Sequence, residues 1–168
     1  PMLMNLVKKT KKQKMSLNFE LFCASNIQHS FLKHFIKDGC VKINNNPILK
    51  SFKNIDFAIV ASGTASLECA ITLTPMVVIY KMSSFSWWVT KAFIKTPFAS
   101  IINVLAKERV VLELLQQGLT VPRLLQIMEN SLNNPEKTQQ TQNIIFNIIK
   151  PLAVKNAYKN TSFYIANY

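Results

Sequence analysis

The chain has 168 residues, 49% of them hydrophobic, which is enough for one domain with a modest core and excludes wholesale disorder. Its 20 Lys and Arg residues against 8 Asp and Glu residues give a net charge of +12, so polyanions or anionic membrane surfaces are expected partners. Cys23, Cys40 and Cys69 are odd in number and far apart, which indicates reduced thiols rather than a disulfide framework.

The N-terminal residues show no export or membrane-spanning signal. They lack the apolar core and cleavage site of a signal peptide, and no run in the chain reaches the roughly 18 consecutive apolar residues that a membrane-spanning helix needs. Because the sequence starts with Pro1 rather than Met, we expect it to be part of something longer.

The first quarter predicts helices that alternate with short strands. We expect a basic amphipathic helix over residues 2–15, a strand over 17–24, a helix over 28–37 and a strand over 41–43. The first helix carries Lys8, Lys9, Lys11, Lys12 and Lys14, which form either a solvated face or a patch that binds nucleic acid. No zinc-finger spacing or RNA-binding aromatic signature supports the second interpretation.

The central stretch predicts a βαβ unit. A turn and a short helix over residues 44–54 lead into a strand over 55–61, a helix over 64–73 and an apolar strand over 76–80. The second strand is apolar throughout, as is typical of parallel strands that are covered on both faces.

The turn Ser62-Gly63-Thr64 joins the first strand of this unit to its helix. Ligands of such units bind where a helix N-terminus presents free N–H groups, and Gly63 lets the backbone approach an anion closely. Glu68 lies one helical turn after Thr64, where its carboxylate could accept the hydroxyls of a ribose. The alternative is an ordinary helix N-cap followed by a solvated acid.

The second half predicts mainly helices. After a helix that begins at Ser83 or Ser84, we expect a strand or extended stretch over residues 98–104 and helices over 106–117, 120–130 and 136–150. The helix that begins at Ser83 or Ser84 carries Trp87 and Trp88 beside lysines, which indicates either a core face or an interfacial membrane patch.

Four blocks in order and spacing resemble the C-terminal half of lipid-A-disaccharide synthases. They are Ala-Ser-Gly-Thr-Ala-Ser-Leu-Glu at 61–68, Thr-Pro-Met-Val-Val-Ile-Tyr-Lys-Met at 74–82, Ile-Asn-Val-Leu-Ala at 102–106 and Val-Leu-Glu-Leu-Leu-Gln at 111–116. The resemblance is clear from about residue 51 to 130 and looser over 17–50.

This resemblance implies a fold and an activity. The fold would be α/β, a Rossmann-like parallel sheet with flanking helices, as in the C-terminal nucleotide-sugar domain of a GT-B glycosyltransferase. Residues 1–150 would form this domain, truncated at its N-terminal side, and 151–168 a C-terminal tail. The whole enzyme would transfer 2,3-diacylglucosamine, with inversion, from UDP to 2,3-diacylglucosamine 1-phosphate in lipid A biosynthesis, without a metal or another cofactor.

The resemblance also assigns roles to residues. Ser62, Gly63, Thr64 and Ala65 would form the diphosphate turn, Glu68 would hold the ribose, and Asn103, Glu113 and Gln116 would be polar residues of the nucleotide-sugar cleft. Tyr80 at a strand end and Arg109 are additional candidates. Arg109 would replace an arginine that the family usually has one position earlier, in a block whose proline and glycine are also absent here.

The catalytic base and the acceptor site are expected in an N-terminal domain that this sequence does not contain. We therefore assign no catalytic residue and expect the chain alone to bind UDP-sugar without transferring it. The missing domain or a separate subunit, the cytoplasmic face of the inner membrane and a second copy of the chain are the partners that the resemblance implies.

Two other functions fit part of the sequence. The chain could be the nucleotide half of another GT-B enzyme, such as a peptidoglycan glucosaminyltransferase, although the blocks around Tyr80 and Asn103 favour the first assignment. It could also be a basic protein that docks on membranes or nucleic acids through its lysines and Trp87-Trp88.

Overall fold

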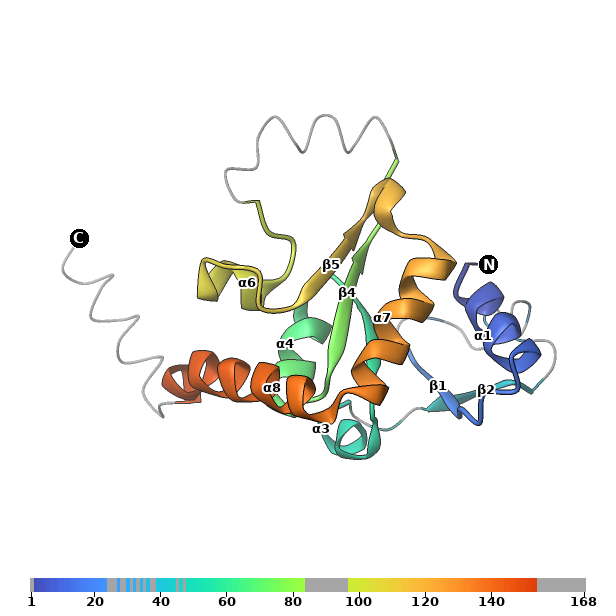
Figure 1. Ribbon diagram of the computed structural model, residues 1–168, viewed down its shortest axis with the longest axis horizontal. Coiled ribbons are helices and arrows are strands. Elements are labelled where there is room, and N and C mark those ends of the chain that lie inside the picture. The colour runs from blue at the N-terminus through green and yellow to red at the C-terminus, as the bar shows by residue number, and fades with distance from the viewer. Residues whose placement is uncertain are drawn as a thin grey trace.

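The computed structural model describes residues 2–23, 27, 30, 32, 34, 36, 39–44, 46, 48–83 and 97–153 (Figure 1). Their elements, in chain order, are α1 (Met2–Lys12), β1 (Phe19–Phe22), β2 (Val41–Asn44), α3 (Ile48–Ser51), η1 (Phe52–Asn54), β3 (Ala58–Ala61), α4 (Thr64–Ile71), β4 (Met76–Tyr80), α6 (Ile101–Ala106), β5 (Leu112–Leu115), η2 (Gln116–Gly118), α7 (Val121–Asn133), α8 (Pro135–Ile149) and η3 (Lys150–Ala153).

All strand pairings among the described residues are parallel. β3, β4 and β5 form one sheet in that order, with Ala58 opposite Met76 and Val77 opposite Leu112. β1 and β2 form a separate sheet, with Phe19 opposite Val41. The α/β class and the parallel strands are thus confirmed, but the described strands lie in two small sheets rather than one.

Side chains of the larger sheet alternate between two hydrophobic clusters. Val60, Met76 and Val78 face a cluster that includes Cys69 of α4, Ile102 of α6 and Ile145 of α8. Ile59, Val77 and Leu114 face the other cluster, which includes Leu6 of α1 and residues of α7. The sheet is therefore covered on both faces, by α4, α6 and α8 on one and by α1 and α7 on the other, which explains the apolar sequence of β4.

Helix α1 is amphipathic, as its sequence predicts. Leu6, Val7 and Thr10 are buried, whereas all five lysines between positions 8 and 14 are exposed. The Lys11 ammonium also donates to Cys40 Sγ at 2.7 Å, a contact between this helix and the residue before β2. Four of the five lysines thus lie exposed on this helix, and Lys14 directly follows it.

Two predicted elements between residues 98 and 117 are wrong. The stretch expected to be extended forms α6, because Ser100 is an N-cap whose side chain accepts from Asn103 N. Lys107 ends this helix in the left-handed conformation, with φ of 58°. Residues 112–115 were expected to be helical but form β5, because pairing with β4 outweighs the helix propensity of Leu and Glu.

The remaining described elements agree with the predictions within a few residues. α7 begins at the Thr120 cap, and its Leu124, Leu125 and Met128 are buried as their spacing predicts. Most of the helix expected over 28–37, nearly all of the aromatic helix, with Trp87 and Trp88, and residues 154–168 of the expected tail lie outside the described residues. No helix among the described residues is long and apolar enough to cross a membrane.

The packing of α7 on the sheet gives a test of the fold. Leu124 is fully buried against Val77 and Leu114, so Leu124→Ala should lower the free energy of unfolding by about 2–5 kcal/mol. Leu105→Ala is the control, because Leu105 is 43% exposed and its truncation should cost well under half as much. Urea unfolding followed by circular dichroism measures both values, and equal losses would contradict this packing.

Candidate functional site

The candidate site lies where β3, β4 and β5 end. Since the three strands are parallel, their carboxyl ends meet at one edge of the sheet. The Ser62 amide continues the ladder by donating to Ile79 O at 3.0 Å. After β4, the Met82 amide donates to Gln116 Oε1 at 3.0 Å, and Gln116 Nε2 donates back to Met82 O at 3.3 Å. Gln116 therefore joins the ends of the second and third strands.

Gln116 is itself in an unusual conformation. Its φ of 48° lies in the left-handed region, which costs a residue with a side chain roughly 1 kcal/mol or more. Its side-chain amide makes two hydrogen bonds to Met82, which hold it against the backbone that follows β4.

The turn after β3 is open. Gly63 has φ of 137°, and a Cβ built on it would meet nothing within 4 Å. Its carbonyl accepts both the amide and the hydroxyl of Ser66, at 3.1 and 2.6 Å, which fixes the start of α4. The Thr64 side chain is exposed, and no side chain caps the helix. The first N–H groups of α4 are thus left for a ligand or water, at the positive end of the helix.

Ser62 holds this turn to a neighbouring segment. Its hydroxyl donates to Ala99 O at 2.5 Å, while the Ala99 amide donates to Glu113 Oε2 at 3.0 Å. The Ser100 amide donates to Glu113 Oε1 at 2.8 Å. The segment before α6 is therefore fixed both to the end of β3 and to a side chain of β5.

Asn103 completes the network from inside the protein. It is fully buried, and its Nδ2 donates to Glu113 Oε1 at 2.7 Å and to Val111 O at 2.9 Å. Its Oδ1 accepts the amides of Val110 and Val111, both at 2.9 Å. We predicted Asn103 as a polar residue of the cleft, but its whole amide is used to shape the loop that leads into β5.

Glu68 lies on α4 and is half-buried. Among the described residues, no group forms a hydrogen bond with its carboxylate. Its charge adds to the effect of burial, which is the larger cause, and together they raise the pKa of the neighbouring Cys69 thiol to about 12. Cys69 therefore stays a neutral core residue, as predicted, whereas the Glu68 carboxylate is left for a ligand or solvent.

The other two candidates are less closely tied to this network. Tyr80 is the last residue of β4 and is half-buried, opposite Leu115 in the register of the sheet. Arg109 is exposed in the loop between α6 and β5. The structure thus brings Ser62, Glu113 and Asn103 together, whereas among the described residues no hydrogen bond or ion pair joins Arg109 or Glu68 to them.

Sequence analysis missed Ala99 and Ser100. Ala99 has no signal of its own, because it acts only through its backbone. Ser100 could have been found, since a serine directly before the apolar run Ile101-Ile102 is a typical N-cap.

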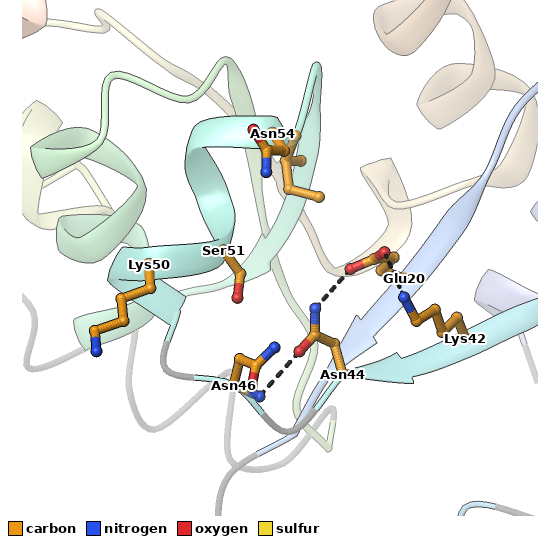
Figure 2. A pocket seen from close by; sticks show the side chains of 8 residues that line it. Glu20, Lys42, Asn44, Asn46, Lys50, Ser51 and Asn54 are labelled. Carbon is orange, nitrogen blue, oxygen red and sulfur yellow. Dashed lines mark hydrogen bonds and ion pairs between the residues drawn. The ribbon is translucent and has the colours of Figure 1, made fainter.

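A polar cavity lies elsewhere, between the β1–β2 sheet and α3 (Figure 2). Its volume is about 530 Å³, and its lining includes Glu20, Lys42 and Asn44. Asn44 Nδ2 donates to Glu20 at 2.8 Å, and the exposed Lys42 ammonium lies 3.7 Å from the same carboxylate. These side chains largely satisfy one another, and none was predicted as a functional residue.

The buried amide of Asn103 gives a test of the site's framework. Asn103→Ala leaves two backbone amides, one carbonyl and part of the Glu113 carboxylate without partners, so the free energy of unfolding should fall by about 2–5 kcal/mol. Asn134→Ala is the control, because it removes one exposed bond to Asn130 O and should cost less than about 1 kcal/mol. Chemical denaturation measures both, and a small loss for Asn103→Ala would contradict the network.

Comparison with known proteins identifies the family. The sequence profile of lipid-A-disaccharide synthetase matches residues 1–166. Lipid-A-disaccharide synthase 1 of Legionella pneumophila (strain Lens) is 30% identical over 159 residues, which cover 94% of this chain and 41% of the relative. The synthase of Yersinia pestis is 52% identical over 62 residues, 37% of this chain and 16% of the relative. That of Myxococcus xanthus (strain DK1622) is 48% identical over 69 residues, 41% of this chain and 18% of the relative.

The chain thus spans about 41% of the length of the Legionella relative that it matches along most of its own length. Since the family profile extends over nearly every residue, including the open turn after β3, the chain belongs to the lipid-A-disaccharide synthase family.

Proposed function

We propose that this chain is the nucleotide-sugar-binding half, the C-terminal one, of a GT-B lipid-A-disaccharide synthase. The observation that carries the proposal is the open turn at Gly63, at the carboxyl end of a parallel strand and at the start of α4, in a chain of this family. That is the place where parallel α/β folds bind nucleotides.

The diphosphate of UDP would rest on the turn formed by Ser62, Gly63, Thr64 and Ala65. The amides of Thr64 and Ala65, at the helix start, and the exposed Thr64 hydroxyl would donate to phosphate oxygens. The Ser62 hydroxyl is already engaged with Ala99 O, so this residue would position the turn rather than bind phosphate through its side chain. Gly63 leaves room for the anion because nothing lies where a Cβ would be.

Glu68 would accept hydrogen bonds from the ribose hydroxyls, because its carboxylate has no partner among the described residues and lies one turn into the helix. Glu113 and Asn103 would hold the cleft wall between α6 and β5, and Gln116 would fix the backbone after β4. Tyr80 would lie at the sugar side of this edge, and the exposed Arg109 would supply a positive charge for an anion.

In the whole enzyme, this half would hold UDP-2,3-diacylglucosamine while an N-terminal domain binds 2,3-diacylglucosamine 1-phosphate and supplies the general base. Donor groups that are fixed before the reaction would stabilise the negative charge that develops on the departing UDP. The missing half would come from the same polypeptide or from a separate subunit, and a homodimer of the complete enzyme fits the same scheme. This chain alone would bind the nucleotide and transfer nothing.

Thermal unfolding with UDP tests the nucleotide site. At a UDP concentration about 100 times Kd, binding should stabilise the chain by about 2.7 kcal/mol, which corresponds to a rise in Tm of roughly 5–10 °C. Glu68→Ala should remove most of this rise at the same UDP concentration, because the ribose loses its acceptor.

Glu129→Ala is the matched control, since Glu129 lies on α7, which covers the opposite face of the sheet. It should leave the UDP-dependent rise unchanged. The proposal is contradicted if UDP does not stabilise the chain, or if Glu68→Ala and Glu129→Ala respond to UDP alike.

We also propose that the complete enzyme meets its lipid substrates at the cytoplasmic surface of the inner membrane, with the lysine face of α1 toward it. Lys8, Lys9, Lys11 and Lys12 are exposed on α1, which carries no acidic residue, and the exposed Lys14 directly follows the helix. Such a face attracts anionic lipid headgroups, with about 1 kcal/mol for each lysine near the surface.

Sedimentation with vesicles that contain anionic lipid tests this surface. Replacing Lys8, Lys9 and Lys12 together by Ala should weaken binding by about 100-fold. The control replaces the exposed residues Lys50, Lys53 and Lys137, which removes the same charge from elsewhere and should have a much smaller effect. Equal effects of the two triple variants would show that net charge alone, rather than the α1 face, drives binding.

A further inference from the structure

An amine and a thiol lie in close contact outside the candidate site. The Lys11 ammonium on α1 donates to Sγ of Cys40, the residue directly before β2, and the two atoms are 2.7 Å apart. N–H···O bonds usually span about 2.7–3.2 Å, and sulfur is a larger atom than oxygen. The nitrogen and the sulfur are therefore unusually close, although the two residues lie 29 positions apart in the sequence.

The backbone on both sides of this contact is held in place. Leu6 of α1 is fully buried in the cluster that α1 shares with α7 and the larger sheet. Val41, the residue after Cys40, begins β2 and pairs with Phe19 of β1. Figure 1 shows α1 beside these two strands. The contact thus joins a packed helix to the start of a paired strand, rather than two loose segments.

Both side chains can be reached from solvent, since Lys11 is exposed and Cys40 is half-buried. The other two thiols differ, because burial raises the pKa of Cys23 and of Cys69, the latter to about 12. Thiols react with oxidants as thiolates, so burial protects these two residues. An oxidant in solution therefore meets Cys40 with an amine already beside its sulfur.

We propose that Lys11 and Cys40 form an oxidative cross-linking site, in which one oxygen atom bridges Lys11 Nζ and Cys40 Sγ. A direct bond between nitrogen and sulfur is far shorter than 2.7 Å, so the two side chains would have to move closer to form it. An oxygen inserted between the two atoms spans about the distance that is already present. The bridge would fasten α1 to the β1–β2 sheet under oxidising conditions.

The reaction balances with two molecules of a peroxide, which is the oxidant. The Cys40 thiolate attacks the first, so that an S–O bond forms, the O–O bond breaks, and a sulfenic acid and water result. The Lys11 amine, once its ammonium has released a proton to solvent, attacks the second in the same way and becomes a hydroxylamine. The hydroxylamine oxygen then attacks the sulfenic sulfur, whose hydroxyl leaves as water. In sum, thiol, amine and two molecules of hydrogen peroxide give the S–O–N bridge and three of water.

The test treats the full chain with dilute hydrogen peroxide and then cleaves it after glutamate. Cleavage at Glu20 and Glu68 places Lys11 in peptide 1–20 and Cys40 in peptide 21–68. The bridge should join these peptides and add about 14 Da to their summed mass, since one oxygen is gained and two hydrogens are lost. Fragmentation in the mass spectrometer locates the link, and it also locates oxidised methionines, which add about 16 Da each.

Two conservative variants identify the amine. Lys11→Arg keeps the positive charge but removes the amine, so the yield of joined peptide should fall at least about 10-fold. Lys12→Arg is the matched control, because Lys12 is the next residue and is also exposed on α1. It should leave the yield unchanged.

The bridge should also stabilise the chain. It closes the loop between positions 11 and 40 in the unfolded state, so the peroxide-treated chain should have a Tm roughly 5–10 °C above that of peroxide-treated Lys11→Arg. Both proteins undergo the same methionine oxidation, so its effect cancels in this comparison.

Four results would overturn the proposal. Peroxide could convert Cys40 to a sulfinic or sulfonic acid without joining the peptides, or the two arginine variants could give equal yields. The joined peptide could have lost two hydrogens without gaining an oxygen, which would indicate a direct S–N bond. Equal Tm values for the cross-linked chain and treated Lys11→Arg would show that the bridge does not fasten α1. None of these measurements depends on the proposed nucleotide site.

Discussion

The arrangement at the carboxyl ends of β3, β4 and β5 depends on the hydrogen bonds that the Glu113 carboxylate accepts. Its two oxygens accept from the amides of Ala99 and Ser100 and from the side chain of Asn103, so one residue of β5 orders the approach to α6. Hydrogen bonds to a charged acceptor are about twice as strong as neutral ones, and they are stronger still where water is largely excluded. Ala99 passes this order on to the turn after β3, because its carbonyl accepts the Ser62 hydroxyl. The first helical turn of α4 is thereby held relative to β5 through atoms that no ligand needs to touch.

This arrangement divides the polar residues of the region into two groups. Asn103, Glu113, Gln116 and the Ser62 hydroxyl are already engaged within the protein, and they define where the strand ends and loops lie. The backbone at Gly63, the exposed Thr64 and the carboxylate of Glu68 are the groups left for a bound molecule. Sequence similarity alone does not distinguish these two groups, since it shows only that the same residue types occur at the same positions. The structure separates the two groups by their hydrogen bonds, and the first group includes Gln116, whose backbone is in the left-handed conformation.

The sequence predicted the elements whose signals are local. Thr120 before Val121-Pro122 marked the start of α7, and the run Met76–Tyr80 was predicted as a strand with the bounds that the structure gives it. The predictions between residues 98 and 117 were wrong because the decisive contacts there are not local in the sequence. β5 forms through its pairing with β4. The buried Asn103 accepts hydrogen bonds from the amides of Val110 and Val111, which lie after the end of its helix. The candidate site was predicted at a strand end only for the turn after β3 and for Tyr80, whereas Glu113 and Gln116 were expected in a helix and Asn103 in an extended stretch. Its link through the backbone of Ala99 could not be predicted, since any residue can supply an amide and a carbonyl.

The all-parallel pairing also bears on how this chain reaches its native state. Parallel neighbours cannot be joined by tight hairpins, so each contact between strands requires the closure of a long stretch of chain before hydrogen bonds compensate for the lost entropy. Domains of this kind fold slowly and leave strand edges exposed to other molecules in the meantime. On a ribosome, β1 and β2 emerge before β3, β4 and β5 are made, so the smaller sheet can pair before the larger one exists.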